Sequence, residues 1–202
     1  WLVAAPFIGI ALATLLVAWL LSQFKYYQLI TGAGATLVSA QFLLSVLFPY
    51  PLVTLLLQLV SGVMVGILMG VTSFYIAQTR TPGELFGLVD MVGVLLMSLM
   101  VAGVSKATGY MGVAGGYLFS GVLCAAYWAL MYAYKIKPVT QGTNAQPDST
   151  LQISVRPILI IVMGVLFVTF SGQGFAFMFS MADNLGMGFE DAGNKIGLIL
   201  FI

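Results

Sequence analysis

The side chains that could do chemistry are few, and the most conspicuous is an amide set deep inside an apolar segment. Gln173 lies near the middle of the segment 157–182, between Gly172 and Gly174. A primary amide at bilayer depth must find hydrogen-bond partners, and the flanking glycines weaken the helix locally. Two interpretations are open. Gln173, with the nearby Ser171, contacts a bound solute, or Gln173 bonds to a neighbouring helix.

A single carboxylate, that of Asp90, lies inside an apolar segment. A charge at the bilayer centre costs about 2.5–3.5 kcal/mol, so such a residue is a functional candidate by default. Asp90 follows Glu84 by less than two helical turns, which favours a position just below the membrane interface at a helix N-terminus. Three roles are therefore open: a structural one, a gate in which Asp90 pairs with Lys25 or Arg80, and a proton carrier.

Several kinds of chemistry are excluded by residue types that are missing or isolated. The chain has no histidine, and Cys124 is its one cysteine, so it offers neither an imidazole base nor a thiolate cluster for a metal. The acidic residues Asp183, Glu190 and Asp191 lack the spacing of a calcium loop, and no phosphate-binding glycine motif occurs. We therefore expect no enzymatic activity, no metal and no cofactor.

The elements that must position these side chains are apolar segments of membrane-spanning length. They run over 2–22, 28–48, 52–78, 85–105, 109–134 and 157–182, and a seventh begins near Phe189. Each is close to the roughly 20 residues that cross a bilayer as a helix. Because 61% of the residues are hydrophobic and 6% are charged, a soluble fold is excluded, and the net charge of +1 gives no reason to expect a nucleic-acid partner. The sequence predicts an all-α, polytopic bundle within a lipid bilayer.

Short polar turns separate these segments and indicate their direction. The turn between the fourth and fifth segments is predicted at 105–109, and tight turns of this kind make neighbouring spans antiparallel. Positive charges then collect on one side of the membrane, which marks that side as cytoplasmic. They are Lys25, Arg80, Lys135, Lys137 and Arg156, against Lys106 and, near the start of the seventh segment, Lys195 as a second candidate on the other side. We therefore expect the polar connector 135–156 to be cytoplasmic and the bilayer to be the plasma (inner) membrane.

Three glycines of the third segment recur at every fourth position. Gly62, Gly66 and Gly70 share one helix face, and small residues at this spacing let a second helix backbone approach closely. The stripe therefore predicts helix packing. The alternative is a sliding contact between two moving bundles.

Three local patterns, which cover four stretches of sequence, resemble the major facilitator superfamily. The glycine-rich stretch from Gln58 to Gly70 resembles the fourth helix of that family, and the stretch 81–87 resembles the turn before its fifth helix. The stretch 185–193 is similar to the entry to the second helix of each half, and the turn 18–27 falls where the family has its signature, with Ser22 in the place of its acidic residue. By this resemblance the chain corresponds to helices two to seven and the start of helix eight of two pseudo-repeated halves, here incomplete.

The resemblance carries expectations about organisation and function. It implies that 1–134 belongs to the N-terminal half, that 135–156 links the halves and that 157–202 begins the C-terminal half. Residues Gln58 and Tyr75 would line a central cavity together with Gln173. We expect a secondary transporter that moves a neutral, zwitterionic or amphipathic small molecule by alternating access, with a proton or another ion as a candidate coupling partner. The alternative is a membrane sensor or scaffold of the same fold that transports nothing.

Overall fold

The computed structural model describes residues 4–77 and 81–133, together with Gly186, Gly188, Asp191 and Lys195. Within the two ranges the chain forms only helices, namely α1 (Ala4–Gln23), α2 (Tyr26–Leu47), α3 (Pro51–Ala77) and α4 (Pro82–Ala133). By length and composition, four helical stretches in this part of the chain could cross a membrane: Ala4–Gln23, Tyr27–Leu47, Pro51–Phe74 and Met100–Ala129, the last of which contains the bend of α4 at Gly112. The prediction of an all-α fold with spans of membrane length is therefore confirmed.

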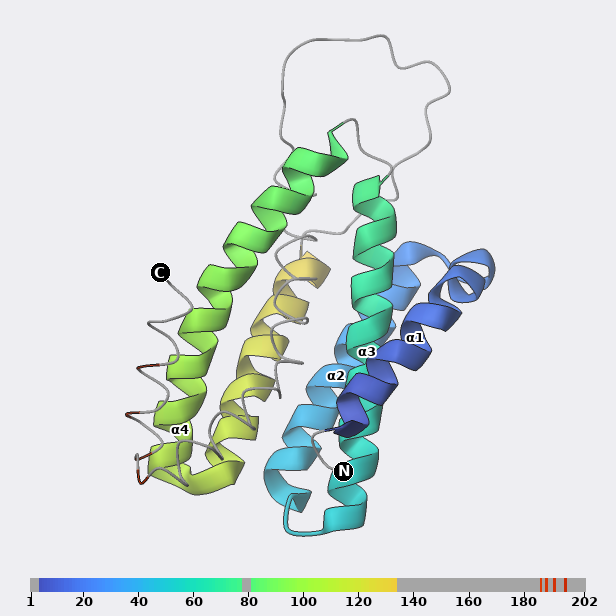
Figure 1. Cartoon of the computed structure of the whole chain (residues 1–202). Helices are drawn as coiled ribbons and strands as arrows, with labels where there is room; N and C mark the ends of the chain where they lie inside the picture. Colours follow the sequence, from blue (N-terminus) through green and yellow to red (C-terminus); the bar gives the residue numbers. More distant parts are fainter. Residues whose placement is uncertain are drawn as a thin grey trace, which may run out of the picture.

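The long helix α4 reverses direction at Gly112. This residue has φ 67° and ψ −163°, a backbone conformation that glycine adopts without the steric cost a side chain would add. The reversal divides α4 into a first arm (82–111) and a second arm (113–133), which run side by side in opposite directions (Figure 1). The turn predicted at 105–109 is wrong, because these residues are helical and belong to the first arm.

The two arms touch closely near the bend. A methyl group added at Gly103 would collide with the ring of Phe119, and one added at Gly115 would collide with the carbonyl oxygen of Ala107. The arms therefore form a helical hairpin whose contact depends on these two glycines.

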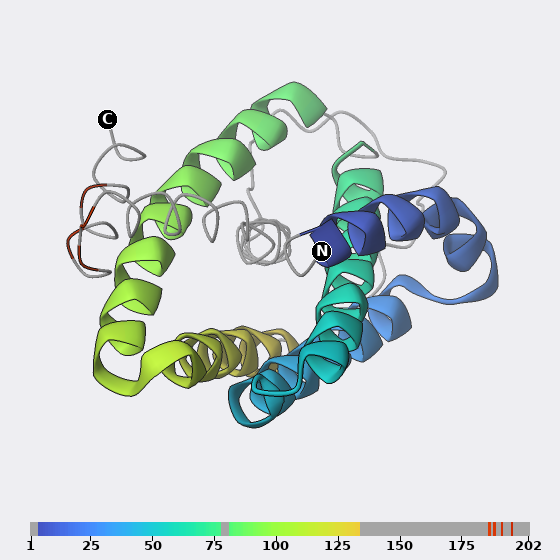
Figure 2. The ribbon, with the colours of Figure 1, turned by 60° about the horizontal axis from the view of Figure 1, so that its bottom comes forward.

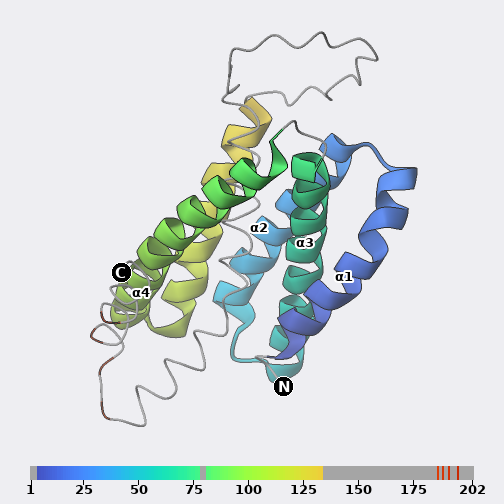
Figure 3. The ribbon, with the colours of Figure 1, turned by 45° about the horizontal axis from the view of Figure 1, so that its top comes forward.

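Successive helices alternate in direction. The turn between α1 and α2 lies at the same end of the bundle as the start of α4, and the turn between α2 and α3 lies at the opposite end, as does the reversal of α4 (Figures 1 and 3). Helix α1 packs against α3, and α2 lies between α3 and α4 (Figure 2). The first arm touches α3 mainly where Ile76 meets Leu85 and Val89.

The core lies where α1, α2, α3 and the second arm of α4 meet, and the outer surface is apolar. Leu37, Val71 and Cys124 are almost fully buried, whereas Leu15, Val46 and Leu52 are more than 70% exposed. The thiol of Cys124 is thus buried in the core. An apolar exterior of this kind suits a lipid environment, since lipid tails impose no cost on exposed leucine and valine.

Candidate functional site

Polar side chains gather inside this apolar bundle on one face of α3. Thr54, Gln58, Ser61 and Thr72 follow one another at helical spacing, and each is at least nine-tenths buried. Burying a polar group without a hydrogen bond costs free energy, so the partners of these side chains show what the face is for.

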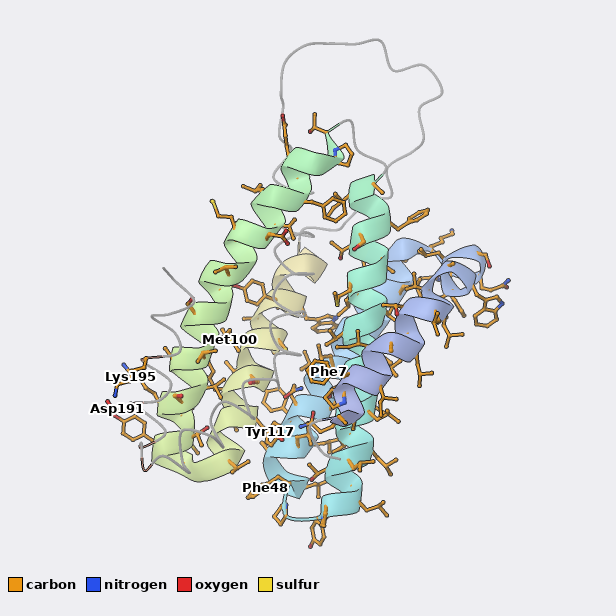
Figure 4. The ribbon with its side chains drawn as sticks, viewed as in Figure 1. Phe7, Phe48, Met100, Tyr117, Asp191 and Lys195 are labelled. Atoms are coloured by element: carbon orange, nitrogen blue, oxygen red, sulfur yellow. The ribbon has the colours of Figure 1, made fainter. Side chains whose placement is uncertain are left out.

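Gln58 reaches across to the second arm of α4. Its side-chain amide Nε2 donates a hydrogen bond to the hydroxyl of Tyr117 at 2.8 Å, and Tyr117 lies between the second arm and α3 (Figure 4). The family resemblance implies that Gln58 lines a central cavity. In the structure Gln58 lies at a contact between α3 and the second arm of α4. Tyr117 accepts this bond, and no described residue accepts the hydrogen of its own hydroxyl group.

Ser61 lies one turn beyond Gln58, and its hydroxyl oxygen is buried without a hydrogen-bond partner. The hydroxyl oxygen of Ser105, on the first arm of α4, is likewise buried without a partner, whereas Thr72 donates to the carbonyl of Leu68 at 2.7 Å and Ser98 to that of Val94 at 3.0 Å. Ser61 makes no such hydrogen bond, although it lies within a helix as Thr72 and Ser98 do. A free hydroxyl inside a packed bundle is available to another molecule.

Helix α2 contributes a second primary amide at the same level. Gln41 is 6% exposed, and no hydrogen bond joins its amide to any other described residue. A methyl group added at Gly121 of the second arm would lie 3.4 Å from the Cβ atom of Gln41, which places Gln41 within one helical turn of Tyr117. Ser120, which is 8% exposed, precedes Gly121 on the same arm.

We call this set the polar junction: Gln41, Gln58, Ser61, Tyr117 and Ser120. Ser61 lies three residues from the middle of α3, or about 4.5 Å along its axis. The junction carries amide and hydroxyl groups and no charged group, so it can donate to and accept from an uncharged polar group. It has no base, acid or thiolate, and the described residues include no group of three potential metal ligands.

The glycine stripe of α3 faces the opposite neighbour, α1. A methyl group added at Gly62 would overlap the backbone of Pro6, one at Gly66 would come within 2.6 Å of the Ala13 side chain, and one at Gly70 would come within 2.6 Å of Val17. Gly9 of α1 makes the reciprocal contact: a Cβ atom added there would lie 2.5 Å from the carbonyl oxygen of Leu59. The stripe is thus filled by α1 and packs two adjacent helices.

Of the charged residues considered for a gate, Lys25 and Asp90 are described, and no ion pair joins them. Lys25 is exposed at the start of α2, where its backbone N–H donates to the side-chain oxygen of Gln28 at 3.1 Å. Asp90 is exposed on the first arm of α4. Among the described residues the one ion pair joins Asp191 and Lys195 at 3.6 Å, labelled in Figure 4.

Several residues named from the sequence lie outside what the structure describes. Arg80, Ser171 and Gln173 are not among the described residues, and of Tyr75 only the backbone, in α3, is described. Sequence reasoning missed Gln41, Tyr117 and Ser120. The available signal was simple: each is a polar side chain within an apolar segment, as Gln58 is.

No protein-family model, curated protein or solved structure matches this chain.

Proposed function

We propose that the chain is part of a secondary transporter that crosses the plasma (inner) membrane several times. Its helices would belong to two pseudo-repeated halves of the major-facilitator kind, joined by the cytoplasmic connector 135–156. The support is the alternation of apolar, antiparallel helices with an apolar exterior, together with the sequence resemblance. Alternating access would expose one interior site first to one side of the membrane and then to the other.

The polar junction is the observation that carries this proposal. Ser61 and Gln41 are buried side chains with hydrogen-bonding groups that have no partner among the described residues, and Ser61 lies near the middle of α3. A bundle needs no such groups for its stability, because leaving a buried hydroxyl such as that of Ser61 unpaired costs about 1–3 kcal/mol. A solute that bonds to them would recover part of that cost.

The chemistry of the junction sets the class of solute. Amides and hydroxyls bond to hydroxyl, carbonyl and amide groups, while the absence of a charged side chain from the junction disfavours a strongly charged solute. A neutral or zwitterionic small molecule fits best. The contact between Gln58 and Tyr117 would hold two walls of the site at a fixed separation.

Flux measured with the full-length protein in proteoliposomes tests the proposal. Labelled neutral and zwitterionic solutes are offered in a panel, and protein-free liposomes give the background. We expect saturable uptake or efflux of at least one of them. Saturable binding without flux would instead support a sensor or scaffold, and neither binding nor flux across the panel would overturn the proposal.

A further inference from the structure

One exposed face of the first arm of α4 combines a carboxylate with apolar side chains. Phe86, Asp90 and Val94 follow at intervals of four residues and therefore lie on one face, and Met91 borders it. Their exposures are substantial, at 39% for Phe86, 68% for Met91 and 46% for Val94. This Asp90 face is separate from the polar junction, which lies on α2, α3 and the second arm.

Within the described part of the chain, nothing covers the Asp90 face at Gly83 and Gly87. A methyl group added at Gly83 or at Gly87 would meet no atom within 4 Å outside its own helix. Both glycines lie on the same side of the helix as Asp90. Gly87 precedes Asp90 by about one turn, and Gly83 precedes it by about two turns. The glycines of α3, by contrast, are covered by α1.

Asp90 has no cationic partner among the described residues. Lys106 lies on the same arm but 16 residues further on, which is about 24 Å along the axis. Lys25 lies beyond α3 at the turn between α1 and α2 (Figure 3). The carboxylate is therefore unpaired in this part of the structure.

Neither lipid nor water suits this face. The arm 82–111 is about 45 Å long and the hydrocarbon core is about 30 Å thick; in an untilted arm centred on the core, Asp90, about 12 Å from Pro82, would lie roughly 5 Å inside it. Its short side chain cannot reach the interface as a lysine can. Lipid would leave the carboxylate unsolvated, and water would leave Phe86, Met91 and Val94 exposed.

We propose that the Asp90 face binds a lipophilic organic cation. The carboxylate would neutralise the positive charge, and the ring of Phe86, one turn away, would add a cation–π attraction. Met91 and Val94 would contact the apolar groups of the ligand, for which the flexible thioether of methionine is well suited. The open space above Gly83 and Gly87 gives the ligand room. This inference goes beyond the proposed transport function and does not depend on it.

Equilibrium binding of tetraphenylphosphonium to the full-length protein in phosphatidylcholine nanodiscs tests the inference. Tetraphenylborate, which has the same shape and the opposite charge, is the matched probe. We expect saturable binding of the cation and no saturable binding of the anion. Asp90→Asn should lower the affinity for the cation at least tenfold. Glu84→Gln, which removes the other carboxylate of the same arm, should change that affinity less than twofold.

Two outcomes would overturn the inference: equal affinity for the cation in Asp90→Asn and the wild type, or equal binding of the two probes by the wild type. Because the second comparison needs no variant, it decides the question even if Asp90→Asn fails to fold. Gly87→Leu, at an exposed position, should also lower the affinity for the cation, because the leucine side chain fills the open space. Flux of other solutes is a separate measurement, so a failed site and a failed transport function are distinguishable.

Discussion

The two sides of α3 hold their neighbours by different means. Toward α1 the contact is made by glycines, and the backbones of the two helices touch at Gly62 and Pro6. Toward α2 and the second arm of α4 the contact includes amides and hydroxyls, some bonded and some without partners. Close backbone packing has one favourable arrangement, whereas polar groups can exchange one partner for another. The first side of α3 is thus suited to a fixed unit and the second to a site.

This difference bears on how the bundle could move. The stripe of Gly62, Gly66 and Gly70 is occupied by α1, a neighbour within the same set of helices. A sliding contact between two separate bundles would need a stripe that is free to meet the other bundle. We therefore infer that α1 and α3 move together as one body.

The largest effect is expected from the glycine side. Gly62→Ala would press a methyl group into the backbone of Pro6, and overpacking of this kind costs about 1–3 kcal/mol. The free energy of unfolding in mixed detergent micelles measures it. Gly32→Ala is the matched control, because an added Cβ there meets nothing within 4 Å, and it should raise stability by about 0.5–1 kcal/mol. Equal effects of the two substitutions would contradict the close contact.

An intermediate effect is expected from the bonded part of the polar junction. Gln58→Leu, Tyr117→Phe and the double variant form a cycle that isolates the hydrogen bond between the two side chains. Hydrogen bonds between membrane helices contribute about 0.6 kcal/mol on average and up to about 1.7 kcal/mol. We expect a coupling energy of that size in the free energy of unfolding. A coupling of zero would show that the contact does not join α3 to α4.

The smallest loss of stability, and a large effect on function, is expected at Ser61. Its hydroxyl has no partner, so Ser61→Ala removes an unpaired buried group and should not lower the free energy of unfolding. Solute flux should nevertheless fall several-fold. Thr72→Val serves as the control, since the Thr72 hydroxyl bonds to its own helix and its loss should leave flux unchanged. Flux that survives Ser61→Ala intact would remove Ser61 from the site.

Much of the fold could be predicted from hydropathy, because spanning segments must be apolar throughout. The segments 2–22, 28–48 and 52–78 agree closely with Ala4–Gln23, Tyr26–Leu47 and Pro51–Ala77. The reversal of α4 was misplaced because the polar residues of 105–109 resemble a turn, and a helix end near the interface also tolerates them. The true signal is Gly112, whose positive φ depends on backbone geometry that hydropathy does not report.

The site was harder to predict than the fold. Gln58 was recognisable as a polar group in an apolar segment, but its partner Tyr117 is 59 residues away, and one sequence gives no information about such a pairing. The free hydroxyl of Ser61 depends on a rotamer and on the neighbouring helices, which only coordinates show. That the glycine stripe faces α1 could not be predicted either, because one sequence does not show which helix lies next to it.

Accessibility of a thiol at position 61 tests the central claim, that the polar junction opens to solvent in the working protein. Ser61→Cys is made in a Cys124→Ala background and treated in proteoliposomes with a charged methanethiosulfonate reagent that does not cross membranes. The wild-type Cys124, 1% exposed in the core beside the junction, is the control. The account predicts that the introduced thiol is modified and that Cys124 is not. An introduced thiol as unreactive as Cys124 would contradict it.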